Sequence, residues 1–155
     1  MSNFLKFFVV FFVSANCYAF DLESTIGVWE RKAVDGAVVE KITNSLISKN
    51  LIQSNISYYK NGKIVRFAAG AFSDIGEKRV GTLHFDVGMV ARLNQISKDE
   101  TSILFSIDIE NNSKITSLWT QMEMKQIGDQ TVMLQTIWKD KDLNSEISKD
   151  IFTKL

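Results

Sequence analysis

Apolar and polar residues alternate in short segments that recur along the chain at intervals of about ten residues. Alternation with a period of two places successive side chains on opposite faces of a β-strand. In the clearest segment, 103–110, the apolar positions are Ile103, Phe105, Ile107 and Ile109. Clusters of Gly, Asn and Asp separate the segments. The pattern predicts an antiparallel meander, in which strands that are consecutive in the sequence pair with one another.

The dipeptide Asn61-Gly62 predicts a tight hairpin between strands at 55–60 and 63–69. Asn-Gly supplies the two positive φ values that a type I′ turn requires. A looser connection is expected over 70–77. Further strands are expected at 26–33, 79–87, 89–96, 103–110, 114–127, 131–139 and 150–155.

One stretch, 35–49, has the spacing of a helix. Val38, Val39, Ile42 and Leu46 recur at steps of four and eight residues, and Asp35 can cap the first turn by accepting from its free amides. The sequence therefore predicts one short early helix.

Eight or nine consecutive strands leave few architectures open. A single sheet of that length curls, and closure into a barrel removes its exposed edges. The absence of proline is compatible with long hydrogen-bonded strands. The expected fold is all-β, an antiparallel meander of eight or nine strands closed into a barrel, formed by one domain over 20–155. A split sandwich gives the same alternation and remains the alternative.

The order of these elements resembles that of the lipocalin-like, or calycin, barrels. The resemblance rests on Gly27-Val28-Trp29 in the first strand, the early helix, the run of hairpins and the terminal 152–155 segment. In that superfamily a Gly-x-Trp closes the bottom of the barrel, and a basic residue near the last strand packs over the tryptophan ring. The resemblance implies this role for Gly27 and Trp29, with Lys154 as the counterpart of the usual arginine. It also implies a cup for a small hydrophobic molecule, or a scaffold whose loops bind protein.

The N-terminal segment 1–19 has the layout of a secretory signal peptide. It carries Lys6, an apolar run over 7–13, and then small or polar residues that end at Ala19. The run is much shorter than the roughly 20 residues of a membrane-spanning helix. We expect cleavage after Ala19 and a periplasmic or secreted chain with no integral membrane segment. Lipidation of Cys17 is the less favoured alternative, because the residues before it fit a lipobox poorly.

Charge and cysteine content exclude several classes of function. The leader holds only one, Lys6, of the 18 basic residues and none of the 18 acidic ones, so the mature chain has a net charge of about −1. Nucleic acid is therefore not an expected partner. The single cysteine, Cys17, leaves with the leader, and burial rather than disulfides must stabilise the fold.

The sequence predicts no catalytic site, metal site or cofactor. The single histidine, His84, precedes Asp86 on the same strand face, where a carboxylate can orient an imidazole, but no nucleophile motif accompanies the pair. An exposed polar pair is the favoured interpretation, and a hydrolase is kept as a third hypothesis. The acidic stretch 140–146 alternates like a calcium loop but lacks its glycine, which favours a solvated turn.

Four residues are candidate contacts for a small hydrophobic ligand or a protein partner: Tyr58, Arg66, His84 and Trp119. Trp119 shares a strand face with polar neighbours, so it points outward if Leu118 and Met122 point inward. The first hypothesis is a non-enzymatic protein that holds a small apolar or amphipathic molecule in its barrel. The second is an inhibitor or immunity protein that binds and neutralises a secreted hydrolase or toxin through an exposed face around Trp119.

Overall fold

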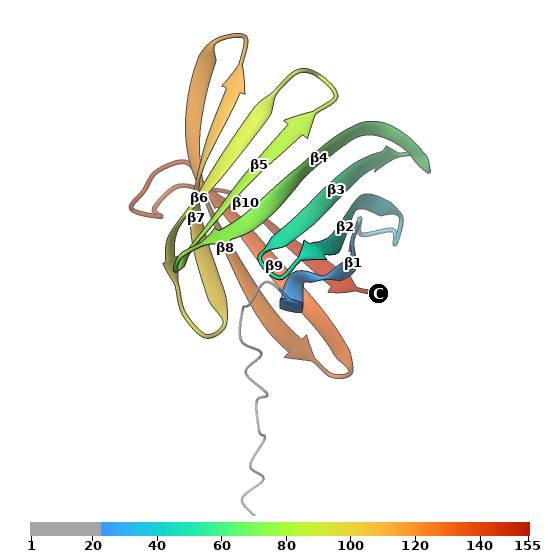
Figure 1. Ribbon diagram of the computed structural model, residues 1–155. Helices are drawn as coiled ribbons and strands as arrows, with labels where there is room; N and C mark the ends of the chain where they lie inside the picture. The colour runs from blue at the N-terminus through green and yellow to red at the C-terminus, as the bar shows by residue number, and fades with distance from the viewer. Residues whose placement is uncertain (1–22) are drawn as a thin grey trace, which may run out of the picture.

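Ten antiparallel strands form one sheet that closes on itself (Figure 1). The computed structural model describes residues 23–155, so the expected leader and its cleavage site lie outside the described residues. The strands are β1 (Gly27–Lys32), β2 (Val38–Ser48), β3 (Leu51–Lys60), β4 (Lys63–Ile75), β5 (Lys78–Phe85), β6 (Val90–Lys98), β7 (Ser102–Asn111), β8 (Lys114–Ile127), β9 (Gln130–Trp138) and β10 (Glu146–Lys154).

Each strand pairs with its neighbours in the sequence, and β1 pairs with β10 to close the barrel. The predicted antiparallel meander and its closure are therefore confirmed. The predicted strand number is wrong, because the barrel has ten strands rather than eight or nine. Within residues 23–155 no helix is long and apolar enough to cross a membrane.

The early helix predicted over 35–49 is also wrong, because β2 occupies most of that segment. Steps of four and eight residues are even numbers, so they satisfy a strand period of two as well as a helical one. Four of the first six residues of β2 are β-branched and favour a strand: Val38, Val39, Ile42 and Thr43. The remaining helical element among the described residues is the 3₁₀ turn η1 (Glu23–Thr25).

The hairpin predicted at Asn61-Gly62 joins β3 to β4, with φ values of 52° and 72° at these two residues. β4 continues without a break to Ile75, through most of the segment 70–77 that was expected to be a looser connection, and the turn is confined to 76–77. Gly70 permits this continuation, because a Cβ atom at position 70 would overlap the carbonyl oxygen of Thr82 on β5. The glycine that suggested a loop is therefore required for close backbone packing.

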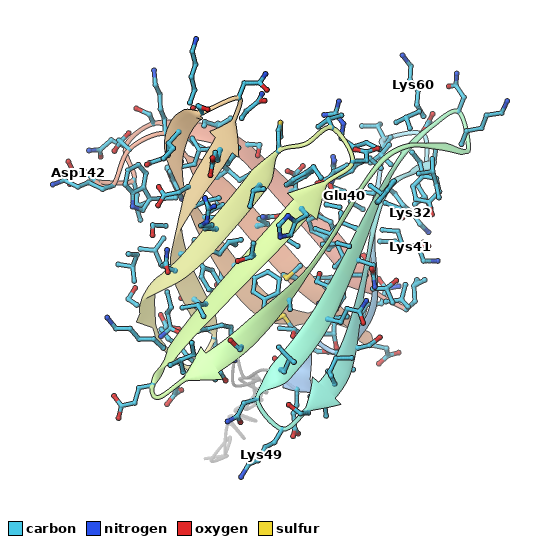
Figure 2. The ribbon with its side chains drawn as sticks, turned by 45° about the horizontal axis from the view of Figure 1, so that its top comes forward. Lys32, Glu40, Lys41, Lys49, Lys60 and Asp142 are labelled. Atoms are coloured by element: carbon cyan, nitrogen blue, oxygen red, sulfur yellow. The ribbon has the colours of Figure 1, made fainter. Side chains whose placement is uncertain are left out.

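The two ends of the barrel differ in what covers them (Figure 1). We call one end the base: it carries η1 and the turns at 49–50, 76–77, 99–101 and 128–129. We call the other end the rim: it carries the connections at 33–37, 61–62, 86–89, 112–113 and 139–145. In Figure 2, Lys60 and Asp142 mark the rim and Lys49 marks the base.

Inward-facing side chains build a core along the barrel axis. The largest fully buried side chains are those of Trp29, Phe105, Phe152, Ile52 and Ile103. Phe105 meets Phe72 edge to face, with 6.5 Å between the ring centroids. This core does not fill the whole interior, and the space that remains is the candidate site.

A cavity inside the barrel as the candidate site

A cavity of about 310 Å³ lies inside the barrel. Its volume is near the lower limit of the range of about 300–1,000 Å³ found for small-molecule sites. The wall is mostly apolar, and Phe72, Phe85, Leu93, Ile107 and Met122 are among its members. A mainly apolar wall with a few polar groups has the composition that small-molecule sites require.

The base of the barrel is covered by η1 and by the pair Trp29 and Lys154. The Trp29 indole N–H donates to the Thr25 carbonyl at 2.9 Å. The Lys154 ammonium lies 5.4 Å from the centroid of the Trp29 ring and donates to the Ser24 carbonyl at 3.2 Å. A Cβ atom at Gly27 would lie 3.1 Å from the Lys154 side chain, so the glycine leaves room for the lysine. The structure thus places Gly27, Trp29 and Lys154 together at the base.

A polar cluster lies on the rim side of the wall, formed by Arg31, Glu40, Tyr58 and Asp150. Arg31 Nε donates to Glu40 Oε2 at 3.0 Å, and Arg31 Nη1 lies 3.3 Å from Asp150 Oδ1. Glu40 and Tyr58 are paired across β2 and β3. Figure 2 shows Glu40 within the barrel, nearer the rim than the base. Glu40, Tyr58 and Asp150 line the cavity, whereas Arg31 does not.

Burial dominates the acid–base behaviour of this cluster. Glu40 is 8% exposed, and burial raises the pKa of its carboxyl above the ordinary value of 4.5, although the hydrogen bond and charge of Arg31 oppose the shift. Burial also raises the pKa of Tyr58, and the adjacent Glu40 charge adds to the effect. Tyr58 therefore presents a neutral hydroxyl to the cavity at any physiological pH.

Arg79 is the cationic residue of the cavity wall. Its side chain is 5% exposed, and its guanidinium is held by Asp74, with Nε donating to Oδ1 at 2.8 Å and Nη2 to Oδ2 at 3.3 Å. This two-point pairing compensates the buried charge. Arg79 is thus already neutralised by a protein carboxylate.

The other polar side chains of the wall are those of Thr25, Asn44, Ser54 and Gln135. Gln135 donates to the Thr120 hydroxyl at 3.3 Å. Asn44 donates from Nδ2 to the Thr25 carbonyl at 3.0 Å, but its buried Oδ1 accepts from no group among residues 23–155. A buried oxygen without a donor costs free energy, which a ligand donor or a water can offset.

The four residues predicted as contacts lie in different places. Tyr58 lines the cavity. Arg66 is paired across the β3–β4 ladder with Tyr58 but is exposed and is not part of the wall. His84 is exposed on the outside of β5, and Asp86 is exposed in the connection after it. Neither His84 nor Asp86 lines the cavity.

Trp119 lies on the outer face of β8, because Leu118 and Met122 line the cavity. It is half-buried and is paired across the strands with Trp138 on β9. The two tryptophans therefore lie side by side on the outside of the barrel.

The acidic stretch 140–146 forms the connection between β9 and β10. Asp140 accepts from the backbone N–H groups of Asp142, Asn144 and Ser145 at 3.0–3.2 Å. These hydrogen bonds lower the pKa of Asp140. Its carboxylate thus shapes the turn.

Sequence reasoning missed Glu40, Asn44, Arg79 and Asp150 as parts of the site. The error at Glu40 and Asn44 follows from the helix predicted over 35–49. As a strand, β2 places Glu40, Ile42 and Asn44 on one face, and the buried Ile42 identifies that face as the inner one. The alternation therefore places these two residues on the inner face once the segment is known to be a strand.

The fold and the site define a closed antiparallel β-barrel with an internal cavity, consistent with the lipocalin-like architecture. No protein-family model matches the chain, and no curated protein matches it in sequence.

Proposed function

We propose that this protein is a non-enzymatic binding protein that holds a small apolar or amphipathic molecule inside its barrel. The observation that supports this most directly is the cavity of about 310 Å³, with an apolar wall and a polar cluster on its rim side. Burial of the ligand's apolar surface provides affinity, and the polar cluster fixes its orientation.

The protein acts in the periplasm or as a secreted protein, after cleavage that follows Ala19. The support is the sequence of the leader, with Lys6 and the apolar run over 7–13. The mass of the exported protein tests this: a chain that begins at Phe20 supports it. A lipid-modified chain that begins at Cys17 favours the alternative anchor.

A binding role is preferred to a catalytic one because the single histidine is not part of the cavity wall. His84 and Asp86 are both exposed and lie outside the cavity wall. General base catalysis by this pair would have to take place on the open outer face, where water competes for every hydrogen bond.

A cavity-filling substitution tests the binding role. Ala91 lies on the wall with an exposed fraction of 4%. Ala91→Phe should place a ring in the cavity and weaken binding of the neutral dye N-phenyl-1-naphthylamine at least tenfold, measured by fluorescence titration. Ala71→Phe, on the exposed outer face of β4, is the matched control and should bind the dye like the wild type.

Overpacking can unfold a barrel, so both variants are first compared by circular dichroism and thermal melting. Ile107→Phe is a second cavity-filling variant, which replaces a larger wall residue and so fills less of the cavity. Equal dye affinity in the wild type and in both folded wall variants would contradict ligand binding inside the barrel.

A protein partner is the second candidate, as expected of an inhibitor or immunity protein. The observation in its favour is the outward-facing pair Trp119 and Trp138, since tryptophan is enriched at the centres of protein interfaces. A protein that co-purifies from the native source and is lost in Trp119→Ser, while dye binding persists, would support it. Co-purification of a small molecule with the unmodified chain would support the first proposal instead.

A further inference from the structure

The charges on the cavity wall are unbalanced in a way that selects among ligands. Two carboxylates, Glu40 and Asp150, line the cavity on its rim side. The guanidinium that bridges them belongs to Arg31, which is not part of the wall. One cation therefore serves two acids from outside the cavity, and the cluster presents its carboxylates to the interior.

The other charged residue of the wall does not reverse this imbalance. Arg79 is paired with both oxygens of Asp74, so its charge is already compensated by a protein carboxylate. The exposed Arg66 lies outside the wall. An anionic ligand thus finds no uncompensated cation on the cavity wall, and it would be repelled by Glu40 and Asp150.

The wall also offers hydrogen-bond acceptors, which favour a ligand that donates hydrogen bonds. Carboxylates of Glu40 and Asp150 accept hydrogen bonds, and the buried Asn44 Oδ1 is an acceptor with no donor among residues 23–155. Asn44 lies four positions after Glu40 on the same face of β2, which is about 13 Å along the strand. Acceptors are therefore available at both ends of this wall.

Between these acceptors the wall is apolar and partly aromatic. Phe72, Phe85 and the ring of Tyr58 line the cavity. An aromatic face attracts a cation, and an apolar body is desolvated favourably against the remaining wall. The volume of about 310 Å³ suits a compact molecule rather than a long acyl chain.

We propose that the ligand is a small amphipathic amine, whose protonated nitrogen contacts Glu40 and Asp150 and whose apolar body fills the cavity. This inference rests on the proposed function, because it names the class of ligand for the same cavity. A protonated amine supplies the positive charge that the pair of carboxylates lacks and donates the hydrogen bonds that they accept.

Three probes of matched shape test the head group. 2-Phenylethylamine, 2-phenylethanol and 3-phenylpropanoate share a phenyl ring and a two-carbon linker, and they differ in charge. Calorimetric titration of the purified protein at pH 7 should rank the amine first, at least tenfold tighter than the alcohol, and the carboxylate last. An alcohol or carboxylate that binds as tightly as the amine overturns the proposed head group but supports the binding role.

Two variants test whether Glu40 and Asp150 cause the preference for the amine over the alcohol. Asp150→Asn and Glu40→Gln should each reduce the advantage of the amine over the alcohol by about tenfold, while the affinity for the alcohol changes by less than about threefold. Glu110→Gln is the matched control, because Glu110 faces outward and pairs with Arg92 at 2.8 Å. An unchanged preference in both folded wall variants overturns the assignment. If none of the probes binds a wild-type protein that does bind the neutral dye, the amine is overturned and the binding role stands; if neither the probes nor the dye bind, both are contradicted.

Discussion

At the scale of single residues, Lys154 connects the last strand to the first turn of the described chain. Its ammonium lies against the Trp29 ring and donates to the Ser24 carbonyl, so one side chain connects Trp29 at the base of the barrel with η1. Its stem passes beside Gly27, where a larger residue would intrude.

Lys154→Met should keep the packing of the stem and lose the charge. We expect the free energy of unfolding to fall by about 1 kcal/mol, because a cation–π contact and a hydrogen bond are both lost. Urea denaturation followed by tryptophan fluorescence measures this change. Lys149→Met, at an exposed position of the same strand, is the control and should be nearly neutral. A larger loss at Lys149 than at Lys154 would contradict the role of Lys154.

Some residues of the site could be predicted from the sequence and others could not. A short motif and a resemblance connect positions that are far apart in the chain, so the sequence could predict the roles of Gly27, Trp29 and Lys154. It could not predict that of Asp150, because its place on the wall depends on the register between β10 and β9, where Asp150 is paired with Gln135. Sequence alternation fixes a face but not a register between distant strands.

At the scale of elements, the hairpin between β3 and β4 shows how strongly two residues can determine a turn. Asn61 and Gly62 both have positive φ, and a Cβ atom at Gly62 would meet no other atom within 4 Å. The cost of a side chain at this position is therefore backbone strain alone.

Gly62→Ala should lower the free energy of unfolding by roughly 1 kcal/mol, because an L-residue is disfavoured in the left-handed region. Asn61→Gly is the matched control: glycine adopts the same φ without strain, so its effect should be much smaller. Thermal melting of the two variants beside the wild type checks the difference. Equal losses in both variants would indicate that the turn does not require its positive φ values.

β2 shows why an element can be assigned wrongly from a correct observation. The apolar spacing in 35–49 is real, but Val38, Ile42 and Leu46 are separated by even steps, and the segment pairs with β1 and β3 over most of its length. Tertiary pairing decided between two periods that the spacing alone could not distinguish.

At the scale of the whole molecule, the meander and its closure were predictable, whereas the cavity was not. Closure follows from the number of strands and their short turns. The size of the cavity depends on strand tilt, on stagger and on how far residues such as Phe72 and Phe105 fill the interior. None of these quantities is encoded in the alternation.

The stability of the whole barrel should depend on pH through Glu40. Its pKa in the folded protein is raised above the ordinary value of 4.5, mainly by burial. The folded state therefore binds this proton more tightly than the unfolded chain does. The resulting stabilisation is fully present below about pH 4.5 and is lost as the pH rises through the folded-state pKa.

Glu40→Gln lacks this titration, so its melting temperature minus that of the wild type should be greater at pH 7 than at pH 4. Differential scanning calorimetry at both pH values measures the change. The exposed Glu110→Gln variant should show a much smaller dependence. A difference for Glu40→Gln that shrinks as the pH rises would contradict the predicted direction.

The seam between β1 and β10 joins the two ends of the described chain. It contains the register pairs Trp29↔Lys154 and Glu30↔Thr153, the Leu155 amide donating to the Val28 carbonyl, and the Arg31–Asp150 ion pair. β10 is synthesised after the nine other strands, so the ring cannot close before β10 has left the ribosome. A chain that stops before β10 would keep two unpaired sheet edges and lose Asp150 from the wall. We therefore expect the shortened chain to pair with other copies through its open edges and to aggregate, rather than to bind ligand more weakly.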